Sequence, residues 1–242
     1  MLRTLLFYPG IILSLIISPI GLIKVKYLEH KGRTKDRTMA IYKITHNWAK
    51  FVIWLSGARV KVFGKENIPK DKAVLFVGNH QSNFDIPLIL STIDEPKGFI
   101  AKKELEKWPL ISMWMKYINC VFMDRSNIRK SAEAIVKGIQ TLKSGYSMVI
   151  FPEGTRSKGK PVAEFKAGSF KLALKSKVKI IPVTINGSYK LLEANGGKIK
   201  ASNIEIYIHE PIDVTKLSKE EIVNLHNTVR NIVVSKLPKE QQ

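Results

Sequence analysis

The sequence predicts an α/β protein with a largely parallel central sheet of about seven strands, helices on both faces, and an N-terminal two-helix hairpin in front. From residue 59 onward, short β-branched apolar runs alternate with helix-like segments. Such alternation is typical of parallel strands joined by helices. Before residue 59 the pattern is helical only, so we divide the chain into a hairpin at 1–57 and an α/β domain at 58–242.

Length and charge limit the classes of partner. A chain of 242 residues can hold one α/β domain and an appendage. Its net charge of +20 points to nucleic acid, an anionic membrane surface or an anionic substrate, with solubility as the ordinary explanation for part of the excess lysine. A single cysteine, Cys120, excludes an internal disulfide and a cysteine-rich metal site. The histidines lack metal-ligand spacing, so we expect neither metal nor cofactor.

The stretch from Leu5 to Ile23 carries no charge and is just long enough for a bilayer core of about 30 Å. Prolines and glycines inside it argue against a straight spanning helix, and a buried core helix is the alternative. A basic cluster follows directly: Lys24, Lys26, Lys31, Arg33, Lys35 and Arg37. Basic residues stay on the cytoplasmic side and attract anionic headgroups. We therefore expect a monotopic or peripheral protein at the cytoplasmic face of the cell membrane, with the hairpin in one leaflet.

The second arm of this membrane-associating hairpin is the amphipathic segment from Met39 to Leu55. Its apolar residues recur at helical spacing, and Trp48 and Trp54 suit a membrane interface. Packing against the α/β domain is the competing interpretation, and both can hold on different faces of one helix.

Seven apolar runs predict the strands. They are Val60–Phe63, Val74–Val77, Gly98–Ala101, Val121–Met123, Met148–Phe151, Ile180–Ile185 and Ile204–Ile208. Helical spacing predicts helices at Leu105–Tyr117, Ile128–Leu142 and Phe165–Lys175. A last helix begins at a capping box formed by Ser218 and Glu221.

The turn after the second predicted strand is the first candidate site. The strand ends at Gly78, His80 follows, and Asp85 stands where Pro87 in a first turn predicts a helix N-terminus. Ligands of open α/β sheets bind at this end of the strands. A neutral imidazole there can take a proton from a hydroxyl, and a carboxylate can orient it. The alternative is a capping aspartate beside an unrelated histidine.

Charged residues follow three other predicted strands, after Ala101, Met123 and Phe151. Glu153 and Arg156 belong to the turn P-E-G-T-R, and Lys102 or Lys103 and Arg125 follow the other two strands. Arginine suits phosphate oxygens, so these cations predict one anion site, whereas a Glu–Arg pair bracing the turn is the plain alternative. The segment G-T-R-S-K-G-K-P nearly matches a phosphate-binding P-loop but ends in proline, which excludes nucleotide hydrolysis.

Together these residues resemble the glycerophospholipid acyltransferases, in particular bacterial 1-acyl-glycerol-3-phosphate acyltransferases. The family motif N-H-x-S-x-x-D is matched from Asn79 to Asp85, and F-P-E-G-T-R-S from Phe151 to Ser157. A second motif resembles V-F-M-D-R, preceded by Asn119 where the family has glycine. A fourth resembles I-P-V at residues 181–183.

The resemblance implies direct acyl transfer from an acyl carrier protein or coenzyme A thioester to the sn-2 hydroxyl of lysophosphatidic acid. His80 would be the base, oriented by Asp85. The acceptor head would contact Lys102, Arg125, Glu153, Gly154, Thr155 and Arg156. Glycerol-3-phosphate or another lysophospholipid is an alternative acceptor, and water would make the protein a thioesterase. A basic, membrane-tethered binding protein is the rival from another class; we expect no nucleic acid as partner.

Overall fold

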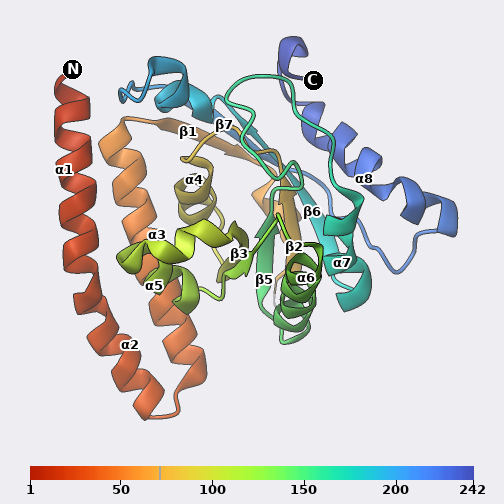
Figure 1. The fold of residues 1–242 in the computed structure, drawn as a ribbon, viewed down its shortest axis with the longest axis horizontal. Helices are drawn as coiled ribbons and strands as arrows, with labels where there is room; N and C mark the ends of the chain where they lie inside the picture. Colours follow the sequence, from red (N-terminus) through yellow and green to blue (C-terminus); the bar gives the residue numbers. More distant parts are fainter. Residues whose placement is uncertain (71) are drawn as a thin grey trace.

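Seven strands form one sheet at the centre of the protein in the order β1-β7-β6-β2-β5-β3-β4 (Figure 1). The computed structural model describes residues 1–70 and 72–242. The strands are β1 Arg59–Phe63, β2 Val74–Gly78, β3 Lys97–Lys102, β4 Val121–Met123, β5 Ser147–Ile150, β6 Lys179–Asn186 and β7 Asn203–Ile208. All seven predicted strands are confirmed.

Strands β6, β2, β5, β3 and β4 run parallel to one another. Strand β7 is antiparallel to β6, and β1 is parallel to β7. The sequence did not predict this reversal. The connection from β6 to β7 contains only short 3-10 helices, whereas a parallel crossover usually needs a helix of its own.

Helices cover both faces of the sheet, as predicted. They are α1 Leu2–Ile17, α2 Gly21–His30, α3 Thr34–Ser56, α4 Asp85–Thr92, α5 Pro109–Tyr117, α6 Ile128–Lys143, α7 Lys171–Ser176 and α8 Lys219–Val234. Helices α1 to α5 pack in the core that contains Phe76, and α6 to α8 pack in the core that contains Leu75. These two neighbours on β2 point to opposite faces, because strand side chains alternate. Strand β2 is therefore buried from both sides, and its end is a fixed point for the site.

Two of the predicted helices begin later than predicted, and the predicted start of the last helix is confirmed. A 3-10 helix occupies Lys103–Lys107, and α5 begins only at Pro109 because Trp108 is extended, as residues before proline are. Similarly, Ala167–Phe170 is a 3-10 helix in front of α7. The capping box of Ser218 and Glu221 is present at the start of α8.

The N-terminal segment forms the predicted hairpin (Figure 1). Helices α1 and α2 are joined by a 3-10 helix at Ser18–Ile20 and together run back along α3. Pro9 lies inside α1 without ending it. Gly10 allows the close approach, because a Cβ there would lie 2.7 Å from Leu55 Cδ2 on α3. The arm thus continues through Pro9 and changes to a 3-10 helix at the segment that contains Pro19.

Helix α3 joins the hairpin to the α/β core. Ala49, Val52 and Ile53 are buried, and His46 Nδ1 lies 2.8 Å from the carbonyl oxygen of Leu90 in α4. The competing interpretation, that this segment packs on the α/β domain, is therefore confirmed for this face of α3.

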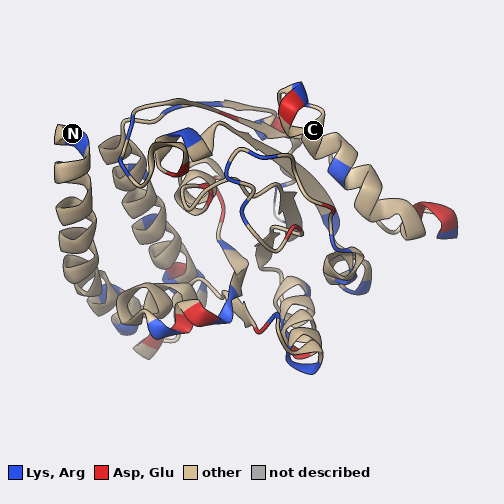
Figure 2. Cartoon of the chain, turned by 45° about the horizontal axis from the view of Figure 1, so that its top comes forward, with Lys and Arg blue, Asp and Glu red and all other residues tan. Residues whose placement is uncertain are grey.

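The outer face of α1 is apolar and exposed, and this apolar surface reaches Ile23 and Tyr27, which lie beside exposed charged residues on α2. Its large side chains are Leu2, Leu5, Leu6, Ile12, Leu13, Ile16, Ile17, Ile20, Ile23 and Tyr27. Figure 2 shows few charged residues along α1 beyond its first turn. The 29 residues Leu2–His30, with a mean hydropathy of 2.1 in their most apolar window, are long and apolar enough to cross a membrane by length and composition alone.

Candidate active site

His80 and Asp85 lie in contact at the end of β2. The Nδ1 atom of His80 is 2.6 Å from Asp85 Oδ2. The same oxygen accepts the backbone N–H groups of Gln81 at 2.7 Å and Ser82 at 2.9 Å, and Oδ1 accepts the Ser188 hydroxyl at 2.5 Å. Asp85 is fully buried, and both of its oxygens accept hydrogen bonds from neighbouring N–H and O–H groups. Nδ1 is the nitrogen of His80 that this carboxyl group contacts.

The imidazole of His80 is held from several sides. Its ring stacks on Phe151 with centroids 4.3 Å apart and an angle of 12° between the planes. Its backbone carbonyl accepts from the N–H of Ser157 at 2.7 Å. One-fifth of the side chain is exposed, and Nδ1 is engaged by Asp85, so Nε2 is the nitrogen that can meet a substrate.

Glu153 fastens two loops through its buried carboxylate. Oε1 accepts the backbone N–H of His80 at 2.6 Å, and Oε2 accepts that of Ala163 at 3.1 Å. Burial raises the pKa of Glu153 to about 7, against the opposing effect of these hydrogen bonds. In this structure the carboxylate therefore contacts the backbone of the histidine turn, although the sequence predicted contact with substrate.

Arg156 lies beside the histidine turn but is paired with an acid that the sequence analysis missed. Its Nη1 donates to Glu193 Oε1 at 3.1 Å. Glu193 also accepts the Ser82 hydroxyl at 2.6 Å and the Asn83 N–H at 3.0 Å. Its side chain is only 7% exposed. Glu193 belongs to no motif and lies far away in the chain, so no local pattern could identify it.

The other predicted cations are placed differently. Arg125 donates to the carbonyl oxygen of Gly154, so it lies at the turn. Thr155 is exposed on the same turn. Lys102 instead pairs with Glu104 at 3.0 Å, and both side chains are well exposed. The structure thus brings Arg125 and Arg156 to the Gly154 turn, whereas Lys102 is paired with Glu104.

Two amides fix the histidine turn to the end of β6. The Asn79 side chain donates to the carbonyl of Ile185 at 2.9 Å and accepts its N–H at 2.8 Å. Gln81 Oε1 accepts the N–H of Gly187 at 3.0 Å. These contacts join the first motif to the end of β6, the strand whose middle contains the fourth motif.

The second motif is preceded by a residue with left-handed backbone. Asn119 has φ of 56°, a region that glycine favours and asparagine tolerates better than most residues. Asparagine can therefore replace the family's glycine here without changing the backbone conformation of the turn into β4.

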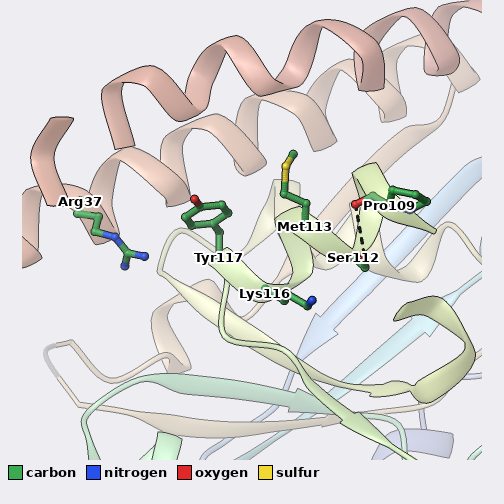
Figure 3. Close-up of a pocket in the computed structure, with 6 residues that line it drawn as sticks. All are labelled: Arg37, Pro109, Ser112, Met113, Lys116 and Tyr117. Carbon is green, nitrogen blue, oxygen red and sulfur yellow. Dashed lines mark hydrogen bonds between the residues drawn. The ribbon is translucent and has the colours of Figure 1, made fainter. Parts of the chain in front are cut away.

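A separate hollow of about 420 Å³ lies between α3 and α5 (Figure 3). It is lined by Arg37, Pro109, Ser112, Met113, Lys116 and Tyr117. None of the predicted site residues lines it.

Comparison with known proteins identifies the family of the chain. The acyltransferase family model matches residues 59–186. A 1-acyl-sn-glycerol-3-phosphate acyltransferase of Borreliella burgdorferi is 37% identical over 188 residues, which cover 78% of this chain and 75% of that protein. A probable 1-acyl-sn-glycerol-3-phosphate acyltransferase of Mycoplasma pneumoniae is 31% identical over 241 residues, covering 95% and 88%.

Among solved structures, the crystal structure of the 1-acyl-sn-glycerophosphate acyltransferase PlsC from Thermotoga maritima is similar, with a TM-score of 0.84 and 33% identity. The match covers 96% of this chain and 92% of that one. Because the match covers nearly the whole chain, it includes the N-terminal hairpin as well as the sheet. By family model, sequence and fold together, the chain belongs to the acyltransferase family.

Proposed function

We propose that the protein transfers a fatty acyl group from an acyl thioester to the sn-2 hydroxyl of 1-acyl-glycerol-3-phosphate, forming phosphatidic acid. The observation that carries the proposal is the contact of His80 with the buried carboxylate of Asp85, directly beside a turn with two arginines. Relatives named for this reaction support the choice of acceptor.

In the first step, Nε2 of His80 takes the proton of the acceptor hydroxyl while its oxygen attacks the thioester carbonyl. Asp85 keeps the proton on Nδ1 and stabilises the imidazolium that forms. The tetrahedral intermediate then collapses, the carbon–sulfur bond breaks, and the thiolate takes the proton from Nε2. The imidazole is neutral again, so the enzyme needs no covalent acyl intermediate.

Cations at the turn would hold the acceptor phosphate. Arg125 and Arg156 reach this turn, and the backbone of Gly154 and Thr155 lies between them. Lys102 could join them by leaving its exposed partner Glu104, because exposed ion pairs are weak. Glu153 contributes by holding the backbone of His80 rather than by direct contact with the phosphate.

Both acceptor and product are membrane lipids, and the hairpin offers a membrane contact. We propose that residues 1–57 act as this contact unit and residues 58–242 as the transferase unit. The exposed apolar face of α1 would enter one leaflet, while the basic cluster after α1 would meet anionic headgroups at the cytoplasmic face. The same positive charge suits an acidic acyl carrier protein or coenzyme A as acyl donor.

The test is acyl transfer from each thioester to labelled 1-acyl-glycerol-3-phosphate in liposomes, with wild type beside His80→Ala. We expect phosphatidic acid from wild type only, since positioned acid–base catalysis is worth about 10²–10⁴-fold. Folding of the variant is checked by circular dichroism. Equal turnover by a folded His80→Ala variant would disprove the role of His80 as the base. If product forms with glycerol-3-phosphate and not with 1-acyl-glycerol-3-phosphate, the proposed acceptor is wrong.

A further inference from the structure

We propose that Lys166 is a further substrate-binding residue, which holds the phosphate of the acceptor together with Arg125 above Gly154. The inference rests on the proposed function, because it names a residue of the same phosphate site. Nothing in the sequence motifs marks Lys166, which lies on the loop before α7.

The placement of Lys166 follows from two contacts with the turn. Its backbone N–H donates to the carbonyl oxygen of Pro152 at 3.2 Å. Its side chain then returns over the turn, because a Cβ built on Gly154 would lie 3.1 Å from Lys166 Nζ. The same Cβ would lie 3.7 Å from Nη1 of Arg125. Glycine at this position, with φ of 74°, leaves the space between the two cations free of a side chain.

The two cations are close enough to share one anion. The two distances bound the separation of Lys166 Nζ and Arg125 Nη1 at 6.8 Å. A phosphate group can accept from two donors that far apart, since each charge-assisted hydrogen bond is about 2.8 Å long. A lysine ammonium on its flexible stem can adjust to such a group, whereas the arginine guanidinium gives it a fixed direction.

The charge balance around the turn supports the same conclusion. Arg156 is paired with Glu193, Lys102 with Glu104 and Lys103 with Asp124. Among residues 1–70 and 72–242, Lys166 forms no ion pair with a carboxylate. Arg125 donates to the Gly154 carbonyl oxygen, and the carboxylate whose charge acts on it, Glu104, is already paired with Lys102. Two cations that repel each other at short range favour an anion between them.

The same turn leads directly to the catalytic pair. Gly154 follows Glu153, whose carboxylate accepts the backbone N–H of His80 at 2.6 Å. A phosphate above Gly154 would therefore lie beside the turn that carries the proposed base. This arrangement connects recognition of the head group with the position of the glycerol hydroxyl.

The experiment compares Lys166→Ala, Lys166→Arg and wild type with two acceptors, 1-acyl-glycerol-3-phosphate and a monoacylglycerol without phosphate. We expect Lys166→Ala to raise the KM for the phosphorylated acceptor by about 10- to 100-fold, the effect of one charge-assisted hydrogen bond. Its kcat and its activity toward monoacylglycerol should change little, and Lys166→Arg should recover most of the affinity. Lys175→Ala, at an exposed lysine on α7, is the matched control.

A second measurement does not depend on the acceptor. Inorganic phosphate should raise the Tm of wild type and of Lys175→Ala, and should do so much less for Lys166→Ala. An unchanged KM and an unchanged phosphate effect would overturn the inference while the proposed function stands. If Lys166→Ala loses activity equally with both acceptors, Lys166 has a structural role, and the inference is overturned as well. A wild type without lysophosphatidate acylation but with Lys166-dependent phosphate binding would overturn the proposed function alone.

Discussion

Arg156 donates a hydrogen bond over 3.1 Å to Glu193, an acid that lies outside every sequence motif of the chain. Glu193 also binds Ser82 and Asn83 in the histidine turn. An acceptor phosphate at this turn must therefore share Arg156 with a buried carboxylate. If the proposed function holds, the arginine would have two separable tasks, one toward the substrate phosphate and one toward Glu193.

Arg156→Ala is expected to raise the KM for the acceptor by about 10- to 100-fold, through the loss of a charge-assisted contact. It should also lower the free energy of unfolding, because Glu193 stays buried without its cation. The double variant Arg156→Ala/Glu193→Gln should recover stability but not the KM. Steady-state kinetics and chemical denaturation measure the two effects. If the double variant regains a normal KM, Arg156 acts only through Glu193.

Asp85→Asn is expected to lower kcat by about 10²–10⁴-fold, because the imidazolium of His80 loses its counter-ion. In the wild type both carboxylate oxygens of residue 85 accept hydrogen bonds, and an amide would put N–H donors at one of these positions. The free energy of unfolding should therefore fall by about 1–3 kcal/mol. Ser188→Ala is the control, since it removes one donor to Oδ1 and leaves the contact with His80. A loss of kcat in Ser188→Ala as large as in Asp85→Asn would contradict a specific role of the His80–Asp85 contact.

Glu153 predicts a pH dependence of stability. Its pKa is about 7 in the folded protein, against 4.5 for an ordinary glutamate. Between these values the folded state holds a proton that the unfolded state has lost, so the free energy of unfolding should fall as pH rises from 4.5 to 7. The decrease should be on the order of 3 kcal/mol.

The measurement is denaturation across this pH window for wild type and Glu153→Gln. The variant has no carboxyl to titrate at this position, so its stability relative to wild type should increase with pH. Parallel pH profiles for the two proteins would exclude Glu153 as the source.

The hairpin predicts a membrane contact that point substitutions can test. Ile16→Asp/Ile23→Asp replaces side chains that are 60% and 71% exposed, so the fold should survive. Binding to anionic vesicles should weaken by about 10- to 100-fold per residue, the value of burying an isoleucine. Vesicle co-sedimentation gives the affinity, and the Tm reports the fold.

The control places the same change elsewhere on the surface. Ile128→Asp/Val223→Asp alters side chains that are 91% and 76% exposed on α6 and α8. Vesicle binding of this variant should equal wild type. Equal losses in both variants would contradict a contact confined to the hairpin. Deletion of residues 1–55 is a less specific test, because it also removes α3, which covers Leu88 and its neighbours in the core.

Local sequence patterns were sufficient for much of the fold. Seven apolar runs became seven strands, and the box of Ser218 and Glu221 caps α8. The contact of His80 with Asp85 was accessible in the same way, because a strand, a turn and a helix N-terminus follow one another within a few residues. Such features depend on backbone hydrogen bonds and on the alternation of apolar and polar side chains. Both are set by residues that are close in the sequence.

Only the tertiary structure decided which distant groups share the site. Ser188 and Glu193 begin short 3-10 helices after β6, and Lys166 lies before the 3-10 helix that leads into α7. None of them follows a periodic pattern, and they meet the histidine turn or the Gly154 turn through side chains. Likewise, Glu153 holds the His80 backbone and Lys102 pairs with Glu104, which the motifs alone could not show. The order of strands in the sheet brings these segments together, and that order results from packing of the whole core rather than from any short stretch of sequence.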